Sequence, residues 1–256
     1  MLRAAGVSVS VPITGFKLTD GLKLFPGGAA MLTEDRVLVV ADMHLGCEAA
    51  LEYQGLSIPR VQTRKIERYM VELIKDLKPK RIIVAGDLKH NFSRNLTQEW
   101  QDVTRFVHVL SDLAPLDVVK GNHDNYLGAI LSDLGISLRN EAQACGYRVL
   151  HGHSGTRTDR PTIVGHLHPS VRLRDDIGGS LKDHCFLHNR SIDMLVLPAL
   201  SIVAPGLDVV RSSDVDFASP LLPRNGLVDF VPILFSKDKA LVFPAVGELR
   251  RSADPR

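Results

Sequence analysis

Five short polar clusters carry the residue types that bind metal ions. They are separated along the chain, and most of them directly follow an apolar run. Carboxylate, carboxamide and imidazole groups are common ligands of divalent transition metals. The pattern therefore points to metal-assisted chemistry. The clusters are Asp42-Met43-His44, Gly86-Asp87, Gly121-Asn122-His123-Asp124, His151-Gly152-His153 and Gly165-His166-Leu167-His168.

A single Asp-x-His sequence would not establish such a site, because either residue also caps turns or bonds to the backbone. The repetition changes the balance. Polar groups buried without partners would cost about 2 to 7 kcal/mol each, whereas a shared metal site would satisfy them together. The glycines beside them permit tight turns. We therefore expect the clusters to meet on one rim of the fold.

The clusters are positioned by short apolar runs that are typical of buried strands. Alternating strands and helices in the first half predict a largely parallel sheet, with ligands beyond the carboxyl ends of its strands. The expected strands are 36–41, 81–85, 116–119, 147–150, 162–164 and 194–197.

Three helices are expected between the early strands, over 60–77, 97–113 and 126–134. In the first, apolar residues recur at helical spacing with charges opposite. After residue 140 strands dominate, which predicts a second sheet packed on the first. A linker over 211–223 and two final strands, 227–235 and 240–243, should follow, and we expect the end from 250 onward to be frayed.

Composition limits the class of protein. The chain has 256 residues, 45% hydrophobic and 23% charged, as expected for one α/β domain spanning 1–256. A net charge of +2 does not steer the whole molecule to nucleic acid or an acidic membrane. Three cysteines without paired spacing favour a reducing compartment, and no secretory or membrane signal is visible. We therefore expect a cytoplasmic protein without membrane contact.

Taken in order, the five clusters resemble the signature blocks of the calcineurin-like metallophosphoesterases. The resemblance covers a motif core over 36–206, with a strand extension over 224–245. Ala41 to Gly46, Gly86 to His90 and Pro198-Ala199-Leu200 resemble the small archaeal and bacterial branch related to the nuclease subunit of the double-strand-break repair complex. The resemblance implies a four-layer αββα sandwich of two mixed sheets flanked by helices.

The resemblance also implies two divalent metal ions and allocates their ligands. Asp87 would bridge the two ions, and a hydroxide between them would attack the phosphorus. Imidazoles and hard oxygens without thiolate suit Mn, Fe, Zn, Co or Ni better than Mg, and we expect Mn among them. The first ion would be held by Asp42, His44 and His168, and the second by Asn122, His151 and His166.

Catalytic and substrate residues follow from the same blocks. By resemblance, His123 would protonate the leaving oxygen or stabilise the transition state, and Asp124 would orient it. Lys89, His90 and Arg94 follow Asp87 closely and are candidates for contact with the substrate phosphate.

Other candidates have competing interpretations. His153 could support the site or make a structural hydrogen bond, and Cys47 could approach the site or be a small buried apolar residue. His184, Cys185 and His188 suggest zinc superficially, but their surroundings alternate as in a strand that ends at a turn. A basic strip of Arg172, Arg174, Lys182 and Arg190 could border a groove for polyanions, or be scattered surface charge.

The leading functional hypothesis is a two-metal phosphodiesterase or nuclease that acts on phosphodiesters, DNA or RNA among them, in a context of DNA repair. A phosphatase or diesterase for nucleotides or small metabolites is the alternative. A non-catalytic scaffold is disfavoured because none of the expected ligands is missing. Oligomeric state and protein partners are left open by the sequence.

Overall fold

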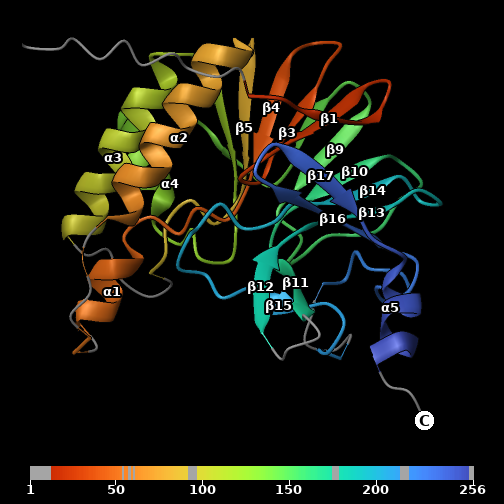
Figure 1. Cartoon of the computed structure of the whole chain (residues 1–256). Coiled ribbons are helices and arrows are strands. Elements are labelled where there is room, and N and C mark those ends of the chain that lie inside the picture. Colours follow the sequence, from red (N-terminus) through yellow and green to blue (C-terminus); the bar gives the residue numbers. More distant parts are fainter. Residues whose placement is uncertain are drawn as a thin grey trace, which may run out of the picture.

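The computed structural model describes residues 13–53, 55–56, 59, 61–91, 97–174, 179–213 and 219–253. Two seven-stranded sheets pack face to face, and the longest helices cover the outer face of the first (Figure 1). This is the mixed α/β sandwich that the sequence predicts. No helix among the described residues is both long and apolar enough to cross a bilayer.

The first sheet has the strand order β1-β2-β3-β4-β5-β6-β7. Strands β1 to β4 pair antiparallel, and β4 to β7 pair parallel. The carboxyl ends of β4, β5 and β6 therefore lie side by side and lead into the first three clusters. The strands are Phe16–Thr19, Leu22–Phe25, Ala29–Leu32, Val37–Val40, Arg81–Ala85, Leu116–Val119 and Leu138–Arg139.

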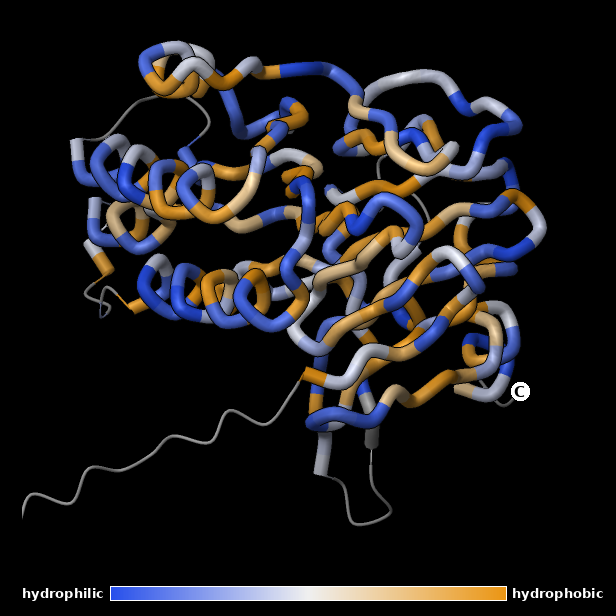
Figure 2. The backbone as a smooth tube through the Cα atoms, turned by 90° about the horizontal axis from the view of Figure 1, so that it is seen from above, coloured by the Kyte–Doolittle hydropathy of each residue, from blue (hydrophilic) through white to orange (hydrophobic). Residues whose placement is uncertain are grey.

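Four helices follow the strands of this sheet: α1 (Cys47–Tyr53), α2 (Gln62–Leu77), α3 (Thr97–Ser111) and α4 (Leu127–Asp133). In α2, Ile66, Met70 and Leu73 are buried against the sheet. Along the helices hydrophobic and hydrophilic residues alternate, as expected for one buried and one solvated face (Figure 2). Helix α2 ends where Lys78 adopts a left-handed conformation.

The second sheet has the order β17-β16-β13-β14-β10-β9-β8. Its central strands β9, β10 and β14 are parallel, so their carboxyl ends also share one edge. Apolar side chains of both sheets form a core between them, with Ile83 and Ile163 fully buried in it. The strands are β8 (Ala142–Ala144), β9 (Tyr147–Leu150), β10 (Thr162–Val164), β13 (Phe186–Asn189), β14 (Met194–Val196), β16 (Val231–Ser236) and β17 (Lys239–Val242).

The outer face of the second sheet is covered by a mixed layer. A three-stranded sheet, β12-β11-β15, lies at its lower end (Figure 1). Residues from the irregular segment after β15, among them Leu221 and Phe230, join Val246 in a third apolar cluster. The remaining elements are β11 (Pro169–Arg174), β12 (Ser180–His184), β15 (Leu207–Asp208) and α5 (Val246–Ala253).

Two terminal expectations were wrong. Residues 227–230 are not strand, because the strand begins only at Val231, where pairing with β13 starts. Residues 250–253 are not frayed, because they belong to α5. Arg250 anchors that helix by donating hydrogen bonds to the carbonyl oxygens of Val209 and Ser212, at 3.0 and 3.2 Å.

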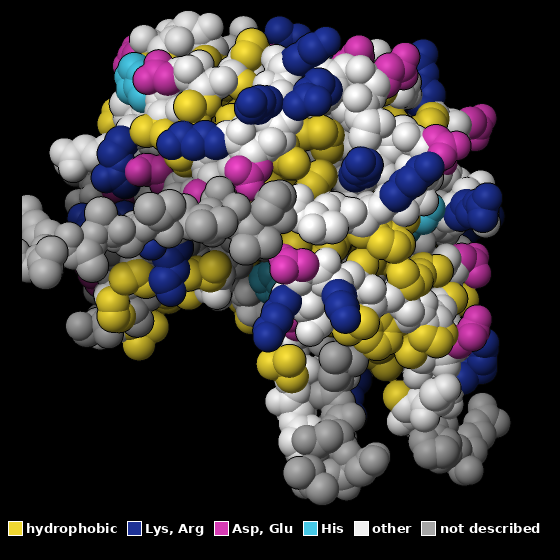
Figure 3. All heavy atoms as spheres, turned by 45° about the horizontal axis from the view of Figure 1, so that its top comes forward, with side chains coloured by type: hydrophobic (Ala, Val, Ile, Leu, Met, Phe, Trp, Pro, Cys, Tyr) yellow, Lys and Arg dark blue, Asp and Glu magenta, His cyan; other side chains and the backbone are white. Residues whose placement is uncertain are grey.

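The basic strip is not continuous. Asn189 pairs with Met194, the first residue of β14, so Arg190 lies at the end of the sheet opposite the clusters. Arg172 is paired with Asp208, and Lys182 donates to the carbonyl oxygen of Gly206. On the face seen in Figure 3, basic side chains are interspersed with acidic and apolar ones. Scattered surface charge is therefore the interpretation that fits this structure.

Candidate metal centre

The seven expected metal ligands come together at the carboxyl ends of strands from both sheets. The backbone N–H of His166, from the second sheet, donates to Oδ2 of Asp42, from the first, at 2.8 Å. The backbone N–H of His44 donates to the carbonyl of Asp87 at 2.9 Å. These hydrogen bonds fix the loops after β4, β5 and β10 relative to one another.

One group of ligand atoms comprises Asp42, His44, Asp87 and His168, all within 4.8 Å of one another. The Nε2 atoms of His44 and His168 are 3.2 Å apart. Nε2 of His168 lies 3.5 Å from Oδ1 of Asp42, and Nε2 of His44 lies 3.8 Å from Oδ2 of Asp87. Two imidazoles and two carboxylates thus point at one small volume.

A second group comprises Asp87, His151 and His166. Nε2 of His151 lies 3.3 Å from Oδ2 of Asp87 and 2.9 Å from Oδ1 of Asn122. Asp87 therefore belongs to both groups, which is the position that a bridging ligand would need.

The donor atoms fit divalent cations. Oδ1 of Asp42 is buried and has no hydrogen-bond partner in the described part of the chain. Two acidic and several imidazole groups share a largely buried site, where unpaired carboxylates would be costly. Ions held by these oxygens and nitrogens would satisfy them. Cys47 is not part of either ligand group, and burial, together with the charge of Glu48, raises the pKa of its thiol to about 12.

The titratable groups of the site shift one another's pKa values. Burial alone would lower the pKa of His151, but its hydrogen bond to Asp87 and the charges of Asp42 and Asp87 raise it to about 9. Burial would raise the pKa of Asp87, but His151 and His44 lower it well below the usual range. For His44, burial dominates and lowers the pKa to about 3. Without ions, protons therefore take part in neutralising the site.

Five of the expected ligands have a left-handed backbone, with φ between 41° and 68°. Such conformations are unusual for residues other than glycine and cost of order 1 to 3 kcal/mol each, so they persist only when the surroundings hold them. Here the strained backbone conformation occurs at five of the seven residues that would hold the ions. These residues are Asp42, His44, Asp87, His166 and His168.

Glycines in the clusters allow the ligands to approach. A Cβ atom on Gly121 would lie 2.1 Å from Oδ1 of Asp87, and one on Gly86 would lie 2.4 Å from Nδ1 of His151. Only glycine leaves room for these two ligands.

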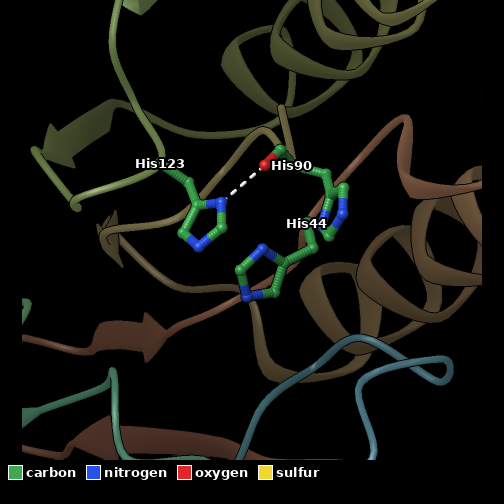
Figure 4. Close-up of side chains that lie close together, drawn as sticks. All are labelled: His44, His90 and His123. Carbon is green, nitrogen blue, oxygen red and sulfur yellow. Dashed lines mark hydrogen bonds between the residues drawn. The ribbon is translucent and has the colours of Figure 1, made fainter. Parts of the chain in front are cut away.

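His123 lies beside the first group of ligands, close to His44 and His90 (Figure 4). Its Nδ1 is 2.5 Å from the backbone carbonyl oxygen of His90. Its ring centroid is 4.9 Å from that of His44. The carbonyl of His90 therefore holds the orientation of this imidazole at the edge of the site.

Asp124 binds three backbone N–H groups of the site, and its expected role in orienting His123 stays a prediction. Its carboxylate accepts the backbone N–H groups of Gly121 and Asp87 at 2.8 Å, and that of Lys89 at 3.2 Å. Burial, reinforced by the charge of Asp87, raises its pKa to about 6. Asp124 thus joins the loop after β6 to the loop after β5.

Lys89 does not reach the substrate side, contrary to expectation. Its side chain is 0% exposed. Its Nζ lies 3.7 Å from Oε2 of the buried Glu99 and donates to the carbonyl of Asn91. It belongs to a buried ion pair that joins the loop after β5 to α3. Arg94 lies outside the described residues.

His90 and His153 lie at opposite sides of the centre. His90 groups with His44 and His123, so its predicted contact with the substrate phosphate stays a prediction. The ring of His153 is 5.2 Å from that of His151 and 6.1 Å from that of His166. His153 therefore accompanies the second group of ligands.

Of the three suggested zinc residues, His184 and His188 belong to strands and Cys185 lies between these two strands. His184 ends β12, and His188 lies in β13. The ring nitrogens of His184 lie 3.1 Å from the carbonyl oxygen of Ala199 and 3.0 Å from that of Ala204. This ring thus contacts the backbone of the loop after β14.

Sequence reasoning missed two buried polar residues that hold the site together. Gln62 is fully buried, and its Nε2 donates to the carbonyl of His44 at 3.0 Å. Glu99 accepts the N–H groups of His90 and Asn91 at 3.0 and 2.6 Å. Both stand near the start of a helix on its apolar stripe, four residues before a buried apolar side chain. A polar residue on the apolar stripe of a helix was therefore the signal in the sequence that could have identified both residues.

A cavity of about 300 Å³ opens beside the first group of ligands. His44, His90, His123 and His168 form its wall on the metal side. No lysine or arginine is among the described residues that line it.

Fold, site and sequence agree on one family. The family model for calcineurin-like phosphoesterases matches residues 35–196, more than half of the chain. The chain therefore belongs to the calcineurin-like phosphoesterase family and is a metal-dependent phosphoric ester hydrolase. The matched range contains every expected metal ligand.

Two solved structures match the chain, and the first of them is similar in fold. The nuclease MPE of Pseudomonas putida is 22% identical, with a TM-score of 0.60, over 83% of this chain and 91% of that one. YfcE, a phosphoesterase from E. coli, is 16% identical, with a TM-score of 0.39, over 67% of this chain and 83% of that one. None of the curated proteins compared with the chain matches it significantly.

Proposed function

We propose that the chain is a phosphodiesterase that uses two divalent ions, manganese first among them, and that nucleic acid is its principal substrate. The observation that carries this proposal is the pair of ligand groups that share Asp87, with His123 next to them. When bound, the ions would supply Lewis-acid chemistry, activating water and neutralising charge on the phosphate.

The chain's own residues have distinct tasks in this proposal. Asp42, His44 and His168 would hold one ion, Asn122, His151 and His166 the other, and Asp87 both. His123 would give a proton to the leaving oxygen, a contribution typically worth about 10² to 10⁴-fold in rate. His90, beside His123, would contact a phosphate oxygen.

The charge around the site favours diesters over monoesters. A monoester dianion is best bound by several fixed cations, whereas a diester carries one negative charge. Lys89 is committed to Glu99, and Lys120 lines a different cavity with His153. The described lining of the cavity beside the ligands contains imidazoles but no lysine or arginine. This arrangement suits a singly charged phosphate.

Nucleic acid as substrate is supported by the resemblance to the repair-nuclease branch and by the name of the P. putida nuclease. The divided basic strip argues against a broad duplex groove. The cavity of about 300 Å³ favours a second candidate, small nucleotide diesters.

The deciding experiment compares bis-p-nitrophenyl phosphate, p-nitrophenyl phosphate, a cyclic nucleotide and end-labelled single-stranded DNA, in Mn, Mg and EDTA. We expect the bis ester and DNA to be cleaved in Mn. Asp87→Asn should lose bound metal and turnover, while Asp117→Asn, which changes a carboxylate paired with Arg81 away from the site, should keep both. Clear preference for the monoester would refute the diesterase, and intact DNA with cleaved small nucleotides would select the second candidate.

A further inference from the structure

The cavity beside the first ligand group has a second wall that the proposed chemistry does not use. Besides the four imidazoles, it is lined by Cys47 and Leu51 of α1 and by the loop residues Val203, Ala204, Pro205 and Ser201, whose hydroxyl is bonded to Gln62. We call this cavity, of about 300 Å³, the ester pocket. Two expected metal ligands, His44 and His168, line the ester pocket. A group attached to a phosphate at the metal centre could therefore extend directly into it.

The chemistry of the second wall is apolar. Leu51, Val203, Ala204 and Pro205 carry no charge and no side-chain hydrogen-bonding group. A neighbouring phosphate would lose hydration there without gaining a cation from the described lining. A flat, uncharged group would gain apolar contact, because its surface would leave water for an aliphatic wall. The wall therefore selects the organic part of an ester rather than a second phosphate.

Its size limits the occupant to one group. Pockets for small molecules typically span ~300 to 1,000 Å³, and the ester pocket is at the lower end of that range. One nucleoside or aryl group is of the right order, whereas a run of stacked bases is too large.

The apolar wall is held in a fixed position relative to the ligands. The side chain of Ser201 donates to Oε1 of Gln62 at 2.8 Å, and the N–H of Val203 donates to the same atom at 3.1 Å. Gln62 in turn donates to the carbonyl of His44. The wall and the ligand loop are therefore joined through one buried side chain, so the pocket is formed before a substrate arrives.

We propose that the ester pocket binds the flat, uncharged group esterified to the phosphate on the side of the leaving oxygen, which is a nucleoside when the substrate is nucleic acid. This inference rests on the proposed phosphodiesterase function. The side is assigned because His123, the expected proton donor, lines the same pocket.

A binding experiment tests the pocket without turnover. Phenylphosphonate and methylphosphonate carry the same charge and differ only in the organic group. Calorimetry with the Mn-loaded protein should give tighter binding of the phenyl compound by roughly 10- to 150-fold, the range expected for burying an apolar group of this size. Equal affinities within twofold would overturn the proposal.

Neighbouring residues supply matched variants. Leu51→Ala combined with Val203→Ala should remove most of the phenyl preference, with metal content unchanged by elemental analysis. Ile202→Ala alters an exposed residue of the same loop that lines a different cavity, and it should keep the preference. Equal loss in both variants would also overturn the proposal.

Turnover separates this inference from the proposed function. The dinucleotide TpT should be cleaved at least ~5-fold faster, as kcat/KM, than analogues in which an abasic residue replaces the thymidine on the leaving side. Cleavage of all analogues at one rate would overturn the pocket but leave the phosphodiesterase intact. Cleavage of no diester, with the phenyl preference retained, would remove the function but not the pocket.

Discussion

At the scale of single residues, the two ring nitrogens of His123 have different tasks. A carbonyl oxygen only accepts hydrogen bonds, so the contact of 2.5 Å to His90 requires the proton on Nδ1. In the proposed function, Nε2 is then the nitrogen that would give a proton to the leaving oxygen. The same contact makes the backbone of His90 responsible for the tautomer of its neighbour.

We expect His123→Gln to retain bound metal and to lose turnover by about 10² to 10⁴-fold on DNA, where the leaving alkoxide needs a proton. The loss should be smaller on bis-p-nitrophenyl phosphate, because p-nitrophenolate leaves without one. Steady-state rates and elemental analysis measure both effects. Loss of metal in this variant would instead identify His123 as a ligand.

At the scale of elements, the buried pair of Lys89 and Glu99 joins the loop after β5 to α3. Removing one partner of a buried ion pair leaves an uncompensated charge and typically costs about 3 to 5 kcal/mol. Lys89→Met should therefore lower the free energy of unfolding by that amount, as measured in urea. Lys89→Met with Glu99→Gln should recover part of the loss. A raised KM with an unchanged free energy of unfolding would contradict this and indicate that Lys89 contacts the substrate.

The close approach of β5 and β6 at the site gives a second prediction at this scale. Gly121→Ala should displace Asp87, because the new Cβ would lie 2.1 Å from its Oδ1. We expect reduced metal content and a loss of about 1 to 3 kcal/mol of stability from overpacking. Gly128→Ala in α4, where a Cβ would make an ordinary contact at 4.0 Å, should be up to about 1 kcal/mol stabilising. Equal metal content in both variants would contradict this.

The elements that could be predicted from sequence are those with a strong local signal. The buried runs at 81–85, 116–119, 147–150 and 162–164 match β5, β6, β9 and β10 residue for residue. The three expected helices, 60–77, 97–113 and 126–134, match α2, α3 and α4 within about two residues at each end. Helix α5 was missed because it has only two buried residues, and it depends on distant contacts such as Arg250 to Val209.

For the site, sequence order indicated which residues gather but not what each contacts. The glycines and the ligand residue types in the clusters are local signals, and from them the gathering of the ligands at one site could be predicted. The contacts of Lys89 and Asp124 depend on loops that meet only in the folded chain. A lysine two residues after Asp87 has the same sequence appearance whether it faces substrate or a buried glutamate.

At the scale of the whole molecule, ligands from both sheets would be tied together by the ions. His151 has a raised pKa of about 9, so the metal-free protein holds a proton that an ion must displace. Metal affinity should therefore rise with pH up to about that value. In the metal-free protein, the stability from this group is complete below its unfolded pKa of about 6.5 and is lost as pH rises through its folded pKa.

We therefore expect Mn to raise the melting temperature more at pH 8 than at pH 6, because bound ligand stabilises by its affinity for the folded state. Scanning calorimetry of EDTA-treated protein with and without Mn measures the difference. Asp87→Asn should show little shift at either pH. A larger shift at pH 6 would contradict the displacement of protons.

The hydrogen bond from His166 to Asp42 joins residues 124 positions apart. Closing so long a loop is entropically costly, and such contacts form late unless many others accompany them. A nascent chain that ends before β10 lacks His166 and His168, so it cannot complete either ligand group. Both sheets must therefore be synthesised and docked before the expected ligand set is complete, so a shorter chain would not hold the ions that the proposed function requires.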